Sequence, residues 1–283
     1  MSKKNCLIIR KYAYIGDLLM LTPTLRSLSN DYVIDILLSD YHEIFFNLPY
    51  IRNIFSFEDH IDNNEYDIVI ELNDYEYNYE RIFSPFIEKT RIELFAEFVK
   101  VNLDSFKIDI RLSQDEEQWA NEYLIEYNLH KKKIILFGIR STSISRDWPI
   151  KKWKELIEKL KSLHYGIIVV DKDLQWQDKN INFFASYGNI RKIFALTSKV
   201  DYILCNDSGL LHIGGAFEKP TLGIFGPTDP ELRCVYKNSY WIKNNLNIKP
   251  AWFNKSQDYN IIKTIEVEDV ERKFLEIAQN DCR

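Results

Sequence analysis

The sequence predicts an α/β protein made of two Rossmann-like domains with parallel sheets, and the order of its apolar segments carries that prediction. Short apolar runs typical of buried strands alternate with longer amphipathic stretches of helical period. The alternation starts again after residue 130, so that the second part of the chain repeats the scheme. Because alternating strands and helices form βαβ units, we expect one parallel sheet in each part. The predicted domains are residues 1–130 and 131–283.

The first domain is expected to contain four strands, at residues 6–10, 33–38, 53–57 and 67–72. A helix with leucines near one face is predicted over residues 17–28, and a second helix over residues 114–127. Pro23 falls inside the first helix and predicts a kink, because proline lacks the backbone N–H of a regular turn. Residues 75–79 are polar and aromatic and fit either a loop or a helix start.

The second domain is expected to contain strands at residues 133–138, 166–170, 202–205 and 221–225. A helix over residues 150–163 places Trp153, Leu156 and Leu160 on one face. The last predicted helix, residues 267–278, follows the final strand. This helix could pack back onto the N-terminal domain.

Composition indicates a folded globular protein, since 46% of the 283 residues are hydrophobic and 28% are charged. No apolar run approaches the roughly 20 residues that span a bilayer, and the N-terminal apolar run is too short for a signal-peptide core. We therefore expect a cytoplasmic protein. The four cysteines are scattered without a CxxC pair, which argues against a disulfide framework or a zinc site.

Charge is divided unevenly along the chain. Residues 1–130 carry 12 Lys and Arg against 24 Asp and Glu, whereas residues 131–283 carry 25 against 18. A basic C-terminal domain suits an anionic ligand such as a nucleotide, and a chance distribution of solvated surface charge is the alternative. No basic stripe with interleaved aromatic residues is present, so nucleic acid is not an expected partner.

A carboxylate follows the first predicted strand, where Gly16-Asp17 opens the helix. Asp17 would lie at the carboxyl end of a strand of a doubly wound sheet, where ligands bind. There it could accept a proton from an attacking hydroxyl. An ordinary helix cap is the alternative, because the unsatisfied N–H groups of a helix start also stabilise a carboxylate.

A second segment joins the predicted strand 202–205 to a helix through residues 206–209, Asn-Asp-Ser-Gly. Such a helix start directs backbone N–H groups at an anion and suits a diphosphate. Asp207 fits an N-cap equally well, and His212 fits a structural residue. Gly214-Gly215 inside the helix predicts close packing against a strand or a ligand, since each glycine costs about 1 kcal/mol relative to alanine.

Two further loops follow predicted strands. Residues 226–230, Gly-Pro-Thr-Asp-Pro, form a rigid turn that offers Thr228 and Asp229 at a strand end. Residues 138–149 contain several hydroxyls and two arginines, of which Arg140 or Arg146 could clamp a phosphate with its forked guanidinium. A structural turn and a solvated basic loop are the alternatives.

Taken in order, these segments resemble the ADP-heptose:lipopolysaccharide heptosyltransferase family, glycosyltransferase family 9. The resemblance rests on Gly16-Asp-Leu-Leu-x-Leu-Thr-Pro, on Asn206-Asp-Ser-Gly-Leu-Leu-His, and on Phe225-Gly-Pro-Thr-Asp-Pro. It implies a GT-B fold, in which the two Rossmann-like domains face each other across a cleft and the N-terminal domain holds the acceptor. It also implies inverting, metal-independent sugar transfer from a nucleoside diphosphate donor, most simply an ADP-linked heptose, with no bound cofactor or metal.

The resemblance also implies roles for individual residues. Asp17 is the expected catalytic base, and Tyr14 and Gly16 are expected to line the acceptor side or form its turn. The expected donor-binding residues are Thr142, Arg146, Asp207, Ser208, Gly209, His212, Thr228 and Asp229. The expected acceptor is a glycan or glycolipid such as lipopolysaccharide or lipooligosaccharide core. The family further implies work at the inner face of the cytoplasmic membrane, with peripheral contact to it.

Two alternatives remain open from the sequence. One is a nucleotide-sugar epimerase on the same two-domain scaffold, which would convert a donor without any acceptor. The other is a catalytically silent nucleotide-sugar binding protein or partner subunit, which would bind the donor without releasing free diphosphate.

Overall fold

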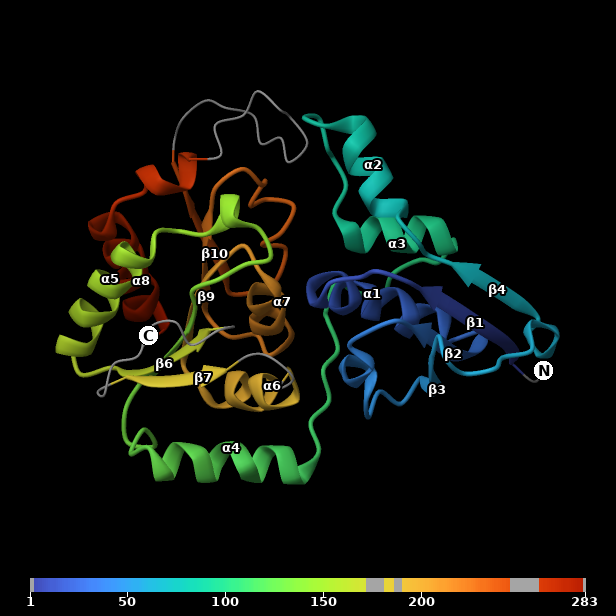
Figure 1. The fold of residues 1–283 in the computed structure, drawn as a ribbon, viewed down its shortest axis with the longest axis horizontal. Helices are drawn as coiled ribbons and strands as arrows, with labels where there is room; N and C mark the ends of the chain where they lie inside the picture. Colours follow the sequence, from blue (N-terminus) through green and yellow to red (C-terminus); the bar gives the residue numbers. More distant parts are fainter. Residues whose placement is uncertain (1–2, 172–180, 186–189, 245–259, 282–283) are drawn as a thin grey trace. The chain divides into compact units, whose positions relative to one another are not determined.

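The structure is a computed structural model and describes residues 3–171, 181–185, 190–244 and 260–281. The chain divides into two compact units, Met1–Arg111 and Leu112–Arg283 (Figure 1). Each unit is built on one parallel β-sheet that carries helices. The predicted architecture of two parallel-sheet α/β domains is therefore confirmed.

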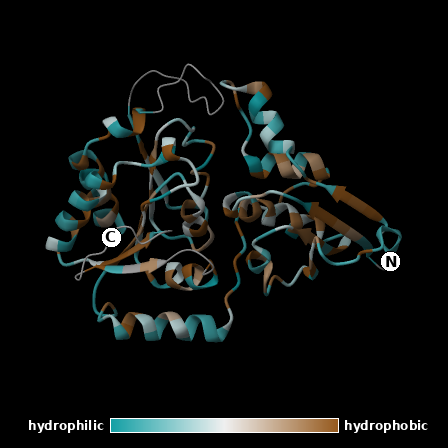
Figure 2. Ribbon diagram, in the orientation of Figure 1, coloured by the Kyte–Doolittle hydropathy of each residue, from teal (hydrophilic) through white to brown (hydrophobic). Residues whose placement is uncertain are grey.

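The first unit contains a four-stranded sheet in the order β3-β2-β1-β4. Its strands are β1 (Lys4–Arg10), β2 (Tyr32–Leu38), β3 (Ile51–Ser56) and β4 (Ile68–Glu71), and Figure 2 shows the apolar character of β1 and β4 in brown. Its helices are α1 (Ile15–Leu28), α2 (Tyr75–Phe83) and α3 (Arg91–Val99), with short 3-10 turns η1 (His42–Phe45) and η2 (Asn63–Glu65). Helix α3 packs on α1. The strand predictions hold to within a few residues, and residues 75–79 begin a helix.

Helix α1 does not end at its proline. The helix continues through Pro23 to Leu28 and is buried over most of its length. Pro23 cannot donate to the carbonyl of Leu19 four residues earlier. The hydroxyl of Thr22 donates to that carbonyl instead, at 2.8 Å. The acceptor freed by proline is thus satisfied inside the helix, which allows the turn to be buried.

The second unit contains a six-stranded parallel sheet in the order β10-β9-β8-β5-β6-β7. Its strands are β5 (Ile134–Gly138), β6 (Gly166–Asp171), β7 (Asn182–Ala185), β8 (Tyr202–Asn206), β9 (Thr221–Phe225) and β10 (Ser239–Lys243). The four central strands are the predicted ones. The two edge strands, β7 and β10, were not predicted, because an edge strand that is partly exposed, as β10 is, lacks the continuous apolar run of a buried strand.

The helices of the second unit are α4 (Gln114–Glu126), α5 (Ile150–Ser162), α6 (Ile190–Lys199), α7 (Gly209–Ala216) and α8 (Val267–Asp281), with 3-10 turns η3 (Ile144–Arg146) and η4 (Ile261–Thr264). Helices α5 and α8 cover one face of the sheet, and α6 and α7 lie on the other (Figure 1). A large cluster of buried apolar side chains lies between the sheet and the α5–α8 pair and includes Trp153, Leu156 and Phe274.

The boundary between the units lies before α4, whereas the sequence predicted it after residue 130. Helix α4 packs on α6. Glu116 of α4 pairs with Arg191 at 2.6 Å, and Glu117 pairs with Lys199 at 3.4 Å. These partners lie more than 70 residues away in sequence, so no local signal assigns α4 to the second unit.

The last helix packs its apolar face within the second unit. Val270, Phe274 and Ile277 of α8 are buried in the core cluster of the second unit. Lys159 of α5 pairs with Glu271 of α8 at 2.9 Å. The apolar stripe of α8 is therefore covered by α5 and the adjacent sheet.

Candidate functional site

Three loops leave the carboxyl edge of the second sheet side by side. They follow β5, β8 and β9, which are adjacent in the sheet. Arg146 lies in the first loop, Asp207 in the second and Thr228 in the third. Because the strands are parallel, their carboxyl ends meet at one edge, and ligands of open α/β sheets bind there. The geometry thus brings together three of the residues that the sequence singled out.

Asp207 is the centre of this cluster and is only 2% exposed. Its Oδ2 accepts a hydrogen bond from the hydroxyl of Thr228 at 2.7 Å and lies 3.3 Å from Nη1 of Arg146. Nη2 of the same guanidinium donates to the Thr142 hydroxyl at 2.6 Å. Arg146 therefore joins the β5 and β8 loops, and Asp207 joins the β8 and β9 loops.

The electrostatics of the cluster favour a charged carboxylate. Burial by itself raises the pKa of Asp207, but the positive charges of Arg146 and Arg233 and the hydrogen bond from Thr228 outweigh it, and the pKa lies below its ordinary value. Asp207 consequently stays ionised at neutral pH and holds Arg146 in place. A guanidinium fixed in this way presents its charge without having to be ordered when an anion binds.

Helix α7 begins directly beside Asp207. Ser208 is its N-cap residue, and Gly209 is its first helical residue; the Ser208 side chain makes no capping hydrogen bond. The neighbouring Asn206 is fully buried and accepts a hydrogen bond from the backbone of Trp148 at 3.1 Å. Asn206 therefore ties the β5 loop to the β8 strand end. The backbone N–H groups at the start of α7 are suited to an anion.

Two predicted donor-binding side chains are engaged within the protein itself. Nδ1 of His212 lies 2.7 Å from the hydroxyl of Tyr236, and both groups are buried. Asp229 accepts a hydrogen bond from the backbone of Glu231 at 3.0 Å, which closes its own turn. In this structure the His212 and Asp229 side chains fit the structural alternatives that the sequence left open.

The glycines of α7 are explained by packing, as the sequence predicted. A Cβ added to Gly214 would collide with Thr221 and Ile203 of the adjacent strands. A Cβ on Gly215 would collide with the ring of Tyr236. The close approach of α7 to the sheet therefore requires glycine at position 214, and its close approach to Tyr236 requires glycine at position 215.

Asp17, the expected catalytic base, lies in the first unit. It sits in the first turn of α1, which follows the carboxyl end of β1, and is 6% exposed. Its Oδ2 accepts a hydrogen bond from the backbone N–H of Tyr14 at 3.3 Å, and its Oδ1 contacts Nη1 of Arg91. Tyr14 is the N-cap residue and is 61% exposed, and Gly16 is inside the helix. Asp17 is therefore both part of a helix cap and an ion-paired carboxylate.

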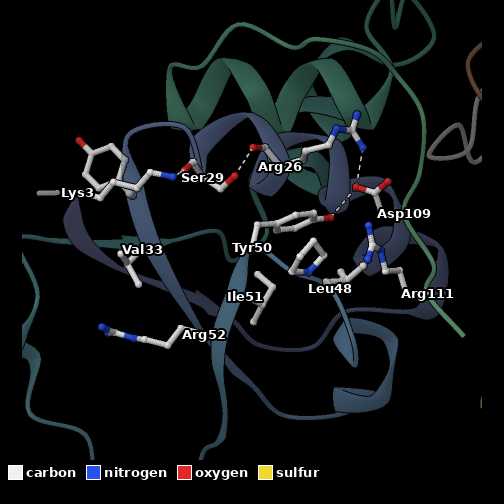
Figure 3. Close-up of a pocket in the computed structure, with 12 residues that line it drawn as sticks. Lys3, Arg26, Ser29, Val33, Leu48, Tyr50, Ile51, Arg52, Asp109 and Arg111 are labelled. Atoms are coloured by element: carbon white, nitrogen blue, oxygen red, sulfur yellow. Dashed lines mark hydrogen bonds and ion pairs between the residues drawn. The ribbon is translucent and has the colours of Figure 1, made fainter. Parts of the chain in front are cut away.

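A cavity of about 480 Å³ opens elsewhere in the first unit, beside the strand starts (Figure 3). Its lining includes Tyr32 and Ile51, which begin β2 and β3. Arg26 at its edge pairs with Asp109 at 2.6 Å, and Asp109 also accepts a hydrogen bond from the Tyr50 hydroxyl at 2.7 Å. Because open α/β sheets bind ligands at the opposite, carboxyl edge, we do not assign the donor or acceptor to this cavity.

In the described ranges, no cluster of three or more His, Cys, Asp or Glu side chains is arranged to hold a metal ion. Across those same ranges, no helix combines the length and apolar character needed to cross a membrane.

The sequence profile of glycosyltransferase family 9 (heptosyltransferase) matches residues 72–260 of this chain. The chain belongs to this family. A curated relative, the lipopolysaccharide core heptosyltransferase OpsX of Haemophilus influenzae, is 24% identical over 201 residues. The aligned part covers 62% of this chain and 56% of OpsX, so the chain spans little more than half the length of that relative.

Solved structures of family 9 proteins share the fold. The glycosyl transferase family 9 from Veillonella parvula DSM 2008 superposes with a TM-score of 0.80 at 15% identity, covering 98% of each chain. The E. coli ADP-heptose lps heptosyltransferase II superposes with a TM-score of 0.73 at 14% identity, covering 99% of this chain and 100% of the other. At these identities the likeness establishes the GT-B fold that the sequence predicted.

The motifs of this family 9 chain did not indicate the surroundings of Asp17. Arg91 and Glu80, which form its ion-pair network, lie outside the three motifs on which the resemblance rests. Thr90 and Glu93 form a reciprocal capping box that begins α3. That box was a readable signal for a helix start at Arg91. The pairing of Arg91 with a residue 74 positions away had no signal in the sequence.

Proposed function

We propose that this chain is an inverting glycosyltransferase that moves a heptose from an ADP-linked donor to a glycan acceptor of the lipopolysaccharide core type, without a metal ion. Membership of family 9 supports the reaction class. The names of OpsX and of the E. coli heptosyltransferase II support the choice of heptose, ADP and lipopolysaccharide. The observation that carries the mechanism is the Asp17 carboxylate, held in a fixed orientation just beyond the carboxyl end of β1.

In the proposed reaction, Asp17 takes the proton of an acceptor hydroxyl. The acceptor oxygen forms a bond to the anomeric carbon on the face opposite the diphosphate, which inverts the configuration. The bond between the anomeric carbon and the diphosphate oxygen breaks at the same time, and ADP leaves with the electron pair. Asp17 therefore needs to be ionised and correctly aimed before the acceptor binds.

Charge develops on the leaving diphosphate, and the second unit offers groups that would stabilise it. The positively charged side chain of Arg146 is fixed by its ion pair with Asp207, and the same guanidinium donates a hydrogen bond to the Thr142 hydroxyl. The start of α7, at Ser208 and Gly209, adds backbone N–H groups. Preorganised donors of this kind stabilise developing charge because they need no reorganisation during the reaction.

The test is an assay of heptose transfer from ADP-heptose to lipopolysaccharide core, in which the release of ADP is measured for the wild type and for Asp17→Asn. The variant keeps the size of the side chain but cannot accept the proton. We expect turnover to fall by roughly 10²- to 10⁴-fold. ADP affinity, measured by calorimetry, should stay within about twofold, since Asp17 is not among the proposed donor ligands. Turnover near the wild-type rate in Asp17→Asn would remove Asp17 from the mechanism.

The same assay separates the two alternatives. Conversion of the donor to an isomeric nucleotide sugar without acceptor would identify an epimerase. Donor binding with no ADP release, whatever acceptor is supplied, would identify a silent binding protein or a partner subunit.

A further inference from the structure

Arg91 connects Asp17 to a second buried carboxylate. Its Nη1 contacts Oδ1 of Asp17, while its Nε and Nη2 donate to the two oxygens of Glu80 at 2.7 and 2.6 Å. The Glu80 residue is only 2% exposed. One guanidinium thus serves two carboxylates, one from α1 and one from α2. The forked geometry of arginine makes this bridge possible.

A second buried ion pair, between Arg10 and Glu76, is formed by the neighbouring charged side chains. Arg10 of β1 donates to both oxygens of Glu76 and to the carbonyl of Leu72, and both charged side chains are buried. Glu76 lies one turn before Glu80 on α2. The packed elements therefore bring together two cations and three carboxylates: Arg10 from β1, Arg91 from α3, Asp17 from α1, and Glu76 and Glu80 from α2.

The sharing of Arg91 between two carboxylates affects how strongly Asp17 attracts a proton. If Arg91 served Asp17 alone, its full charge would hold the carboxylate ionised but weaken its attraction for a proton. Glu80 forms the bidentate pair with the guanidinium, and its negative charge offsets part of the effect of Arg91 on the proton affinity of Asp17. The remaining contact, from Nη1, still fixes the orientation of the Asp17 carboxylate. Burial lowers the pKa of Arg91, but Asp17, Glu80 and Glu76 together hold it well above its ordinary value. The bridge is therefore a permanent cation.

We propose that Arg91 and Glu80 are positioning residues for Asp17: Arg91 aims its carboxylate, and Glu80, acting through Arg91, keeps it basic enough to take the acceptor proton. The inference rests on the proposed role of Asp17 as the base.

The decisive comparison is Glu80→Gln against Glu76→Gln. Each removes one buried negative charge from the same helix, but only Glu80 is bound to Arg91. In Glu80→Gln the whole charge of Arg91 acts on Asp17, so the acid limb of the pH profile of kcat/KM should move to lower pH by about one unit. The plateau rate should fall while KM changes little. Glu76→Gln should leave the limb near its wild-type position, and Glu80→Asp, which keeps the charge, should restore it.

Arg91→Lys tests the aiming role. A lysine keeps one positive charge but cannot form the two-sided fork. We expect kcat to fall by roughly 10- to 100-fold with a smaller change in KM, because a displaced base is misaligned with the acceptor. Thermal unfolding of each variant identifies any that fails to fold.

An acceptor-independent measurement accompanies the kinetics. Proteins labelled with ¹³C at the aspartate carboxyl group are titrated, and the Asp17 signal is assigned by its loss in Asp17→Asn. The Asp17 midpoint should move to lower pH in Glu80→Gln and not in Glu76→Gln.

An unchanged midpoint in folded Glu80→Gln, or equal shifts in both Gln variants, would overturn the inference. Those outcomes differ from failure of the proposed function, in which Asp17→Asn itself retains turnover.

Discussion

Nη1 of Arg146 lies 3.3 Å from Oδ2 of Asp207, although the two residues are 61 positions apart in the chain. The contact is direct and largely buried, with the Arg146 side chain 17% exposed. It fixes a cation at the carboxyl edge of the second sheet, where the start of α7 also presents backbone donors. The pair is therefore the structural centre of the proposed donor site, and its two members can be tested separately.

Removing the Arg146 side chain should weaken nucleotide binding. In Arg146→Ala we expect the Kd for ADP to rise by roughly 10- to 100-fold, the loss that corresponds to one charge-assisted hydrogen bond to phosphate. Isothermal calorimetry below the unfolding temperature measures this. Arg140→Ala is the matched control, since Arg140 lies in the same loop but faces Asp147 at 4.0 Å and Asp171 at 3.8 Å. Equal losses in the two variants would contradict a specific role for Arg146.

Replacing Asp207 by Asn should destabilise the protein in a pH-dependent way. The folded pKa of Asp207 is lowered, so its stabilising contribution is present above the ordinary unfolded value of about 3.9 and is lost as the pH falls below it. We expect Asp207→Asn to lower the free energy of unfolding by about 2–3 kcal/mol at pH 7. The difference from the wild type should shrink below about pH 4. Urea unfolding at both pH values measures it, and a constant difference would contradict the charged pairing.

His212 should prove to be structural. Its Nδ1 is hydrogen-bonded to the buried Tyr236 hydroxyl, so His212→Phe should cost about 1–3 kcal/mol through the unsatisfied phenol. Tyr236→Phe should cost a similar amount, and the double variant should cost less than the sum of the two, because the same hydrogen bond is lost. ADP affinity should remain near the wild-type value in folded protein. A large loss of ADP affinity in His212→Phe alone would assign the imidazole to the donor.

Gly214→Ala should destabilise the second unit without touching the proposed donor groups. The added methyl group would meet Thr221 and Ile203 in a buried contact, which overpacks the space between α7 and the sheet. We expect a loss of about 1–3 kcal/mol, visible as a lower Tm. An unchanged Tm would mean that α7 can move away from the sheet at no cost.

The sequence predicted the central strands of both sheets because each is mostly apolar. It did not predict β10, which lies at an edge and is partly exposed, so that polar and apolar residues are mixed in it. The sequence also placed the domain boundary after α4, because the ion-pair partners of α4 lie more than 70 positions away along the chain. Helix α4 is joined to the second unit by the ion pairs of Glu116 and Glu117 with α6 and by the packing of Trp119 and Tyr123 on Phe184 of β7.

By itself the sequence determined the two parallel-sheet domains, the family and the places where chain segments leave strands with chemically active side chains, because strand patterns and motifs are local. Only the tertiary structure decided which of those side chains meet. It joined Arg146 to Asp207 and Thr228, turned His212 toward Tyr236, and surrounded Asp17 with Arg91 and Glu80. Such pairings are decided by burial, because a charge removed from water must find a partner wherever the fold brings one.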